Sequence, residues 1–231
     1  MRVCRQALES GGHRDPVAST QFPIARLYAI IDPAQAGGRS VVEVADALLS
    51  AGVKLIQYRD KRGSSREVYE NARSIAARIE GSGALFVVND RADLAMALDA
   101  DGVHLGQEDL PVESARQLFG SARARTKWIG NSTHTLVQVE EADRSSADYI
   151  AFGPIFATGS KEQPDAVVGL DGLRRARRAT RKPLVAIGGI TLDNAREVIE
   201  AGADSVAVIG DLLKQSGIAA RAREFLTVLH R

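Results

Sequence analysis

Short runs of apolar residues recur along the chain and alternate with segments whose apolar residues are spaced as in a helix. The runs predict eight strands, at residues 27–31, 53–58, 85–89, 102–105, 128–131, 149–152, 184–187 and 206–209. Helical spacing is clear at 41–49, 68–79, 112–119, 136–142, 192–199 and 219–229. Near-continuous apolar strands that alternate with helices are typical of a parallel sheet covered by helices.

Similar residues lead into several of these strands. Ala51-Gly52-Val53, Ala147-Asp148-Tyr149 and Ala201-Gly202-Ala203 each follow a helical segment. A glycine at this point is the expected helix C-cap, so the chain repeats a helix-to-strand unit about every 25 to 30 residues. Eight such units in 231 residues fit a single-domain (β/α)8 barrel, and a doubly wound open sheet is the alternative.

Composition narrows the class of protein. The formal net charge of +1 provides no global field to attract nucleic acid, so any phosphate recognition must be local. The single cysteine, Cys4, cannot form an internal disulfide, and no apolar stretch approaches the roughly 20 residues of a membrane span. We therefore expect a cytoplasmic protein, either monomeric or homo-oligomeric. Residues 1–23 are expected to be a disordered N-terminal extension, and residues 24–231 the catalytic barrel.

Polar residues collect directly after the predicted strands. In a (β/α)8 barrel the functional groups lie at the carboxyl ends of the strands, so these residues are candidates for a site. They are Gln57 to Lys61, Asn89 to Arg91, Gly106 to Asp109, Asn131 to His134, Gly153 to Lys161, Gly188-Gly189 and Gly210.

The most informative of these motifs follows the second strand. Side chains alternate along a strand, so Gln57, Arg59 and Lys61 should point one way, and Tyr58 and Asp60 the other. Arginine offers a fork of donors to phosphate oxygens and lysine a compact charge, so this face suits a phosphorylated ligand. The alternative is a basic strand end that is simply solvated.

Asp90 and Asp109 follow adjacent predicted strands. Parallel neighbours lie about 4.8 Å apart, which lets two carboxylates at the rim approach one ion. Mg²⁺ suits such a pair because it keeps several waters and bridges to substrate phosphates. The alternatives are an N-cap at Asp90 and a turn residue at Asp109, before Pro111.

Glycines suggest a second phosphate site, separate from the first. Gly188-Gly189 ends the seventh strand before Thr191, a candidate N-cap, and Gly210 ends the eighth. Glycine lets the backbone approach an anion closely, and barrels often bind phosphate between these strands. Lys161, in the long loop after the sixth strand, could close over a leaving phosphate.

Two histidines lie near the predicted strand ends. His104 should face the barrel interior, where a hydrogen-bonded core histidine is favoured over a catalytic one. His134 lies where a helix begins, and it could cap that helix or contact a ligand.

Taken in order, these motifs closely resemble those of the thiamine-phosphate synthase family. The resemblance runs from about Leu27 to the end of the chain and includes Gly102 to Asp109 and Gly153 to Phe156. It implies a (β/α)8 barrel that joins hydroxymethylpyrimidine diphosphate to a thiazole phosphate. Such an enzyme uses Mg²⁺, releases pyrophosphate, and passes through a pyrimidine carbocation.

The resemblance also implies roles for individual residues. The pyrimidine diphosphate would be contacted by Gln57 and Asn89, and Tyr58 and Asp60 would also bind substrate. Its diphosphate would be held by the catalytic residues Arg59, Lys61, Ser132 and Lys161. Mg²⁺ would be bound by Asp90 and Asp109. The thiazole phosphate would be bound by Thr158, Gly159, Ser160, Gly188, Ile209 and Gly210.

The sequence departs from the family pattern at two places. The loop Ala157 to Ser160 stands where the family usually has a proline and a threonine-rich triplet, and Gly210 stands where serine is common. Two alternative functions share the barrel. A thiazole tautomerase would have a histidine in place of Pro154, and a silent ligand-binding regulator would have lost a site cation or carboxylate.

Overall fold

The strands close into a barrel. The computed structural model describes residues 22–120, 127–159 and 165–230, and within these the strands are all parallel and pair in chain order. The eighth strand pairs with the first, which confirms the predicted (β/α)8 barrel and excludes an open sheet. The strands are β1 (Leu27–Ile31), β2 (Leu55–Tyr58), β3 (Leu85–Asn89), β4 (Gly102–Leu105), β5 (Trp128–Thr133), β6 (Tyr149–Phe152), β7 (Leu184–Ala186) and β8 (Ser205–Val208).

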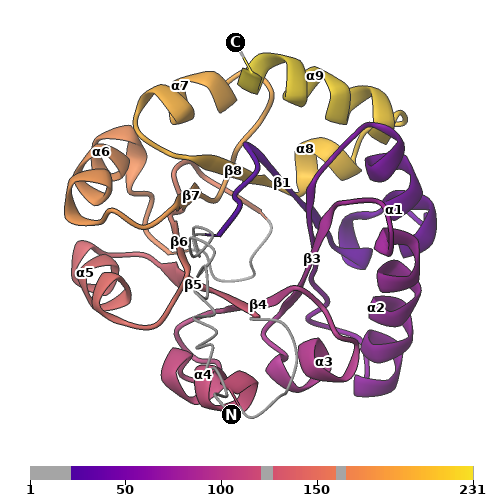
Figure 1. The fold of residues 1–231 in the computed structure, drawn as a ribbon. Coiled ribbons are helices and arrows are strands. Elements are labelled where there is room, and N and C mark those ends of the chain that lie inside the picture. Colours follow the sequence, from indigo (N-terminus) through magenta and orange to yellow (C-terminus); the bar gives the residue numbers. More distant parts are fainter. Residues whose placement is uncertain (1–21, 121–126, 160–164, 231) are drawn as a thin grey trace, which may run out of the picture.

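Helices form a ring around the barrel, which Figure 1 views along its axis. They are η1 (Pro33–Gln35), α1 (Val41–Ser50), α2 (Ser65–Ile79), α3 (Ala92–Ala97), α4 (Val112–Gly120), α5 (Leu136–Arg144), α6 (Gly169–Ala179), α7 (Ala195–Glu200), α8 (Gly210–Leu213) and α9 (Ile218–His230). Among the described residues, no helix combines the length and apolar character required to span a bilayer.

The starts of several helices are fixed by reciprocal side-chain caps. Ser64 Oγ accepts from Glu67 N at 3.3 Å, and Glu67 Oε2 accepts from Ser64 N at 2.8 Å. This capping box satisfies amides that the first turn of α2 leaves free, and it ends the loop that carries Lys61. The expected N-cap at Thr191 is wrong, because Asn194 occupies that position in α7 and accepts from Thr191 N at 2.8 Å.

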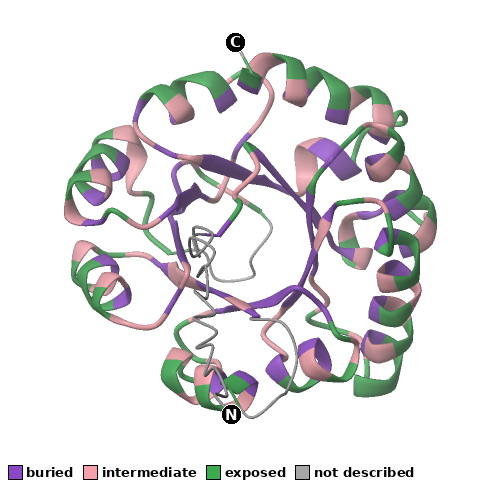
Figure 2. Cartoon of the chain, viewed as in Figure 1, coloured by how far each residue is buried: buried purple, intermediate pink, exposed green. Residues whose placement is uncertain are grey.

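Apolar side chains form two layers. The larger lies between the strands and the surrounding helices, and the smaller fills the barrel interior with Tyr28, Leu55, Val87 and Tyr149 among its members. Figure 2 shows the strands almost entirely buried and the outer faces of the helices exposed. Most strand residues are therefore buried on both faces of the sheet, which explains the near-continuous apolar runs in the sequence.

The floor of the interior is closed by Phe22, which precedes β1. Its ring stacks on Tyr149 with centroids 4.6 Å apart and meets the edge of Trp128 at 5.4 Å. Phe22 falls within the stretch assigned to the N-terminal extension, yet it packs as part of the barrel. The rest of that extension, residues 1–21, lies outside the described residues.

Candidate functional site

The cations after β2 lie among carboxylates at the rim of the barrel. Arg59 Nη1 lies 2.5 Å from Asp32 Oδ2, and Asp32 directly follows β1, the neighbouring strand. The Arg59 amide donates to the carbonyl of Ile31 at 2.9 Å, which extends the β1–β2 pairing to this point. Asp32 is buried, so the guanidinium is held rigidly rather than left free in solvent.

Lys61 forms an ion pair with Asp90, and the Asp90 carboxyl also contacts that of Asp109. The amide of Asp90 donates to the carbonyl of His104 at 2.8 Å, which ties the end of β3 to β4. Asp90 has a left-handed backbone, with φ of 63°. Such a conformation is uncommon outside glycine and is often found at functional sites. The structure thus brings together three charged residues that follow three consecutive strands, β2, β3 and β4.

The alternative roles predicted for the two carboxylates were an N-cap at Asp90 and a turn residue at Asp109, and only the second is observed. Asp90 is not an N-cap, since Arg91 occupies that position in α3 without a side-chain cap. Asp109 does shape a turn, because its Oδ2 accepts from Gly106 N at 2.7 Å. The same carboxyl group also contacts Asp90.

The environment makes Asp90 harder to ionise. Burial raises its pKa from 3.8 to about 6, with a further contribution from Asp109, while Lys61 acts in the opposite direction. A divalent cation between two such carboxylates would relieve their repulsion. Across the described residues no cluster has three or more metal-binding side chains, so a metal here would take its other ligands from water and substrate.

This raised pKa predicts how the metal-free protein responds to pH. Because the folded state binds the Asp90 proton more tightly than the unfolded state, stability should fall as pH rises from about 4 to 6. The free energy of unfolding should fall by at most about 3 kcal/mol, because each unit of pKa shift corresponds to about 1.4 kcal/mol. Asp90→Asn should therefore be more stabilising, relative to wild type, at pH 7 than at pH 4.5. Urea unfolding in the presence of a chelator measures the difference in free energy of unfolding between the variant and wild type at each pH. The same difference at pH 4.5 and pH 7 would contradict the prediction.

Tyr58 and Asp60 lie away from this cluster. Tyr58 packs in the outer apolar layer, and its hydroxyl donates to Asp60 Oδ2 at 3.1 Å. Asp60 Oδ1 accepts from the amides of Arg62 and Gly63, each at 2.9 Å. The predicted alternation is confirmed. These two residues, which the family resemblance implies bind substrate, shape the loop that holds Lys61.

Other predicted residues line the barrel interior just below the rim. Gln57 is buried, and its Nε2 donates to the hydroxyl of Tyr28 at 2.8 Å. His104 is also buried, with Nε2 2.8 Å from Ser132 Oγ, so the prediction of a hydrogen-bonded inward histidine is confirmed. Asn89 pairs in register with His104 and so lies at the same level of the barrel.

The glycines after β7 allow two loops to pack backbone against backbone. Gly188 has φ of +88°, and a Cβ there would lie 2.4 Å from Pro154 Cβ. Its carbonyl accepts from Phe156 N at 3.1 Å. This contact fixes the start of the loop that continues to Thr158 and Gly159. The remaining predicted residues of that loop, Ser160 and Lys161, lie outside the described residues.

Ile209 and Gly210 lie at the start of α8, directly after β8, the strand that pairs with β7. The φ of Gly210 is not in the left-handed region, and a Cβ there would meet Gln35 Oε1 at 3.3 Å. The position therefore accepts a small side chain with little adjustment. Gly188 and Gly210 follow adjacent strands, as the two-site prediction requires.

His134 links two loops rather than capping a helix. Its Nδ1 lies 2.6 Å from the carbonyl of Gly153, and its Nε2 lies 3.4 Å from Asp165. Thr135 is the N-cap of α5.

Sequence reasoning missed three residues that organise the site. Asp32 orients Arg59, and its position directly after β1 was an available signal. Tyr28 and Tyr149 were counted as apolar core, but their hydroxyls bond to each other at 2.9 Å inside the barrel. A tyrosine in an apolar run gives no sign of where its hydroxyl will find a partner.

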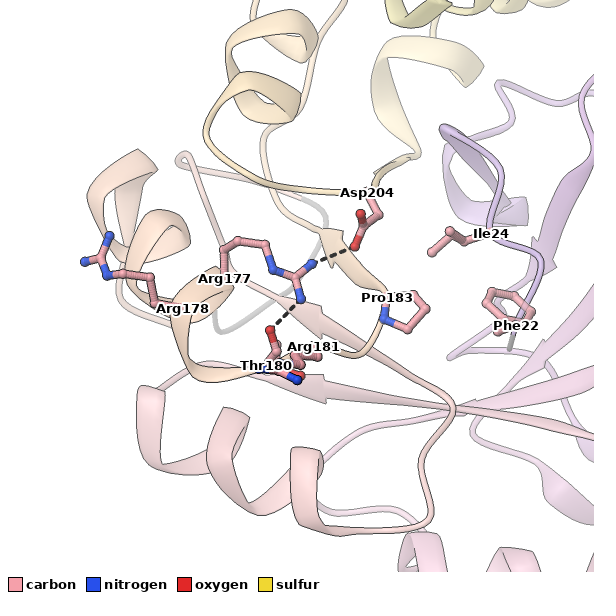
Figure 3. Close-up of a pocket in the computed structure, with 8 residues that line it drawn as sticks. All are labelled: Phe22, Ile24, Arg177, Arg178, Thr180, Arg181, Pro183 and Asp204. Atoms are coloured by element: carbon pink, nitrogen blue, oxygen red, sulfur yellow. Dashed lines mark hydrogen bonds and ion pairs between the residues drawn. The ribbon is translucent and has the colours of Figure 1, made fainter. Parts of the chain in front are cut away.

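A pocket of about 590 Å³ lies at the opposite end of the strands, beside residues that precede β1, β7 and β8. Figure 3 shows Arg177 directed to Asp204 and Thr180, and Arg178 pointing away. Arg177 donates to Asp204 Oδ2 at 2.7 Å and to the carbonyls of Thr180 and Lys182 at 2.6 and 2.9 Å. Its donors are committed to holding α6 on the barrel, and none of the described residues predicted for the site lines this pocket.

Comparisons with known proteins identify the family of this chain. The sequence model described as "Thiamine monophosphate synthase" matches residues 27–212. A thiamine-phosphate synthase of Koribacter versatilis is 50% identical over 89% of this chain and 96% of the relative. One from Chloroflexus aurantiacus is 43% identical over 86% of this chain and 90% of the relative.

Solved structures agree as well. Thiamine phosphate pyrophosphorylase from Pyrococcus furiosus is 36% identical, with a TM-score of 0.79, over 89% of this chain and 95% of that structure. A 3-hexulose-6-phosphate synthase at 19% identity and a TM-score of 0.66 shares the fold alone. The chain therefore belongs to the thiamine monophosphate synthase family and is a transferase of thiamine biosynthesis.

Proposed function

We propose that the enzyme condenses 4-amino-2-methyl-5-(diphosphooxymethyl)pyrimidine with 4-methyl-5-(2-phosphooxyethyl)thiazole in a Mg²⁺-dependent reaction. The products are thiamine phosphate and pyrophosphate. The observation that carries this proposal is the grouping of Arg59 and Lys61 with the carboxylates of Asp90 and Asp109 at the carboxyl ends of β2, β3 and β4. Cations next to a metal-binding carboxylate pair suit a diphosphate leaving group.

The reaction breaks the bond between the pyrimidine methylene carbon and the diphosphate oxygen. The bonding electrons leave with pyrophosphate, and the amino-substituted pyrimidine stabilises the resulting methylene cation. The thiazole ring nitrogen then donates its lone pair to that carbon. No protein nucleophile is needed, so the enzyme acts by positioning, by charge stabilisation and by excluding water.

The residues at the carboxyl ends of β2, β3 and β4 form the first site, which binds the diphosphate leaving group. Arg59, held by Asp32, and Lys61 donate to the diphosphate oxygens, and Ser132 adds a hydroxyl. Lys161 is proposed to contact the same oxygens from the loop after β6. Asp90 and Asp109 would hold Mg²⁺, which would supply positive charge beside the departing pyrophosphate. Gln57 and Asn89 lie just below, at a depth that suits contact with the pyrimidine ring.

The second site holds the thiazole phosphate. We assign it to Thr158, Gly159 and Ser160 in the loop after β6, with Gly188, Ile209 and Gly210 on the ends of β7 and β8. The close packing of Gly188 against Pro154 brings these segments together, so one phosphate can reach backbone amides from both. In this proposal the thiazole nitrogen approaches the methylene carbon from the side of the barrel rim formed by β7 and β8.

The alternatives fit less well. A thiazole tautomerase needs an acid or base where Pro154 stands, and this proline packs against Gly188 instead. A silent regulator would have lost charged groups of the first site, yet Arg59, Lys61, Asp90 and Asp109 are all present, with Arg59 paired to Asp32 and Lys61 to Asp90.

The direct test mixes the purified protein with both phosphorylated precursors and Mg²⁺. Mass spectrometry should detect thiamine phosphate and pyrophosphate in equal amounts. Formation of neither product, in a protein whose circular dichroism shows a folded barrel, would remove the proposal.

Gly210→Ser is expected to change the affinity for thiazole phosphate by less than about tenfold. Gly210 has room for a Cβ and no left-handed backbone, so the variant should fold normally. A single neutral hydrogen bond contributes about 0.5 to 1.5 kcal/mol, which sets this limit. Calorimetric titration of the thiazole phosphate measures the change. A hundredfold gain would show that the wild-type site is poorly matched to this substrate.

A further inference from the structure

A continuous chain of hydrogen bonds crosses the barrel interior. Gln57 Nε2 donates to the hydroxyl of Tyr28 at 2.8 Å, and that hydroxyl lies 2.9 Å from the hydroxyl of Tyr149. The Tyr149 hydroxyl lies 3.1 Å from His104 Nδ1, and His104 Nε2 lies 2.8 Å from Ser132 Oγ. The chain thus begins and ends at residues of the pyrimidine diphosphate site, with buried groups between them.

A glycine on β5 makes this chain possible. His104 on β4 and Tyr149 on β6 are not on adjacent strands, and Gly130 pairs in register with both. A Cβ at Gly130 would lie 2.1 Å from Tyr149 Cζ and 2.5 Å from His104 Nδ1. The absence of a side chain at this point therefore lets the histidine and tyrosine meet across the intervening strand.

The donors and acceptors can be ordered from one end. The nitrogen of the Gln57 amide can only donate, so the Tyr28 oxygen accepts from it. The Tyr28 hydroxyl then donates its own hydrogen bond to the Tyr149 oxygen. Tyr149 then donates to His104 Nδ1, which leaves the ring proton on Nε2, directed at Ser132 Oγ. Burial raises the pKa of both tyrosines well above its ordinary value, so both hydroxyls keep their protons.

The opposite order is less favourable. If His104 donated from Nδ1, Tyr149 would donate to Tyr28, whose oxygen would already accept from Gln57. The Tyr28 proton would then have no acceptor among the hydrogen bonds of the described residues. An unsatisfied buried donor costs about 1 to 3 kcal/mol, which favours the first order.

We propose that this order turns the hydroxyl proton of Ser132 outward as a donor to the bound diphosphate. Because Ser132 Oγ accepts from His104, its own proton is free for an anion. His104 and Tyr149 act through Ser132 and are therefore positioning residues. The inference rests on the proposed function for the identity of the anion, but the order of the hydrogen bonds does not.

The tautomer of His104 tests the order without any substrate. Long-range ¹H–¹⁵N spectra of ¹⁵N-histidine protein distinguish a ring protonated at Nε2 from one protonated at Nδ1. His104→Gln assigns the signal among the four histidines. We expect protonation at Nε2 alone. A ring protonated at Nδ1, or at both nitrogens, overturns the inference.

A double-mutant cycle tests whether Tyr149 acts through Ser132. With Mg²⁺ present, Ser132→Ala should weaken the binding of inorganic pyrophosphate about tenfold or more, and Tyr149→Phe about threefold to tenfold. In the Ser132→Ala background, Tyr149→Phe should have less than about a twofold effect. Tyr69→Phe, which removes a hydroxyl from α2 outside the site, serves as the control. Additive losses would mean that Tyr149 is merely structural and would overturn the inference.

The two experiments separate this inference from the proposed function. A ring protonated at Nδ1, in a protein that still makes thiamine phosphate, overturns the inference alone. A ring protonated at Nε2, in a protein that makes none, supports the hydrogen-bond order and removes the proposed function. If Tyr149→Phe does not fold, Tyr28→Phe interrupts the same chain one step earlier and replaces it in the cycle.

Discussion

Asp90→Asn and Asp109→Asn should each lower turnover about a hundredfold or more at saturating substrates, because each removes a charged ligand from the proposed Mg²⁺. Asparagine is the appropriate replacement at both positions. It tolerates the left-handed backbone of Asp90, and it preserves the acceptor that Asp109 offers to Gly106 N. Steady-state rates measured over a range of Mg²⁺ concentrations should show that both variants need more metal.

The matched control is Asp46→Asn, which removes an exposed carboxylate from α1. It should leave the rate and the metal requirement unchanged. If wild type keeps full activity in chelator-treated buffer, or if the two site variants behave like this control, the metal assignment is wrong.

Lys61→Met is expected to produce the second large effect. The lysine is half exposed, and its ammonium group can turn from Asp90 to the departing diphosphate. Losing that contact in the transition state should cost roughly 2 to 4 kcal/mol, or about 30-fold to 1,000-fold in kcat/KM for the pyrimidine substrate. Lys161→Met should have a similar effect if its loop closes over the same oxygens. The KM for thiazole phosphate should stay within about twofold, because a separate site binds it.

The complementary variant is Thr158→Val, which should raise the KM for thiazole phosphate and leave that for the pyrimidine substrate unchanged. Gly188→Val would not serve this purpose. Its side chain would collide with Pro154 and strain a left-handed backbone, so it would disturb the loop itself. Identical kinetic defects in Lys61→Met and Thr158→Val would contradict the two-site arrangement.

The barrel could be predicted from the sequence because burial on both faces leaves a local signal in every strand. β1, β3, β4 and β6 have the predicted bounds. β2 begins two residues later than predicted and β7 ends one residue earlier, and two further differences occur where polar residues pair within the sheet. β5 runs on through Ser132 and Thr133, and Thr133 Oγ1 bonds to the carbonyl of Ala151 at 2.9 Å. β8 starts at Ser205, whose hydroxyl contacts the carbonyl of Arg26.

The candidate site could be predicted only in part. Asp90, Asp109 and Lys61 were expected to meet because they follow adjacent strands. Partners from different strands, such as Asp32 for Arg59, depend on side-chain direction at the rim, which sequence spacing does not encode. The tyrosine hydroxyls were missed for the same reason, since a buried polar contact leaves no periodic pattern.

The ion pairs at the rim have a consequence for selectivity. Arg59 is paired with Asp32 and Lys61 with Asp90, so the cations of the free enzyme already have internal partners. A lone phosphate anion must displace a carboxylate to bind Lys61, which leaves that carboxylate uncompensated. A metal and a diphosphate that arrive together avoid this penalty, because the metal takes Asp90 while the anion takes the lysine. We therefore expect heterotropic coupling, in which each of these two ligands tightens the binding of the other, and only weak competition from metal-free phosphate metabolites.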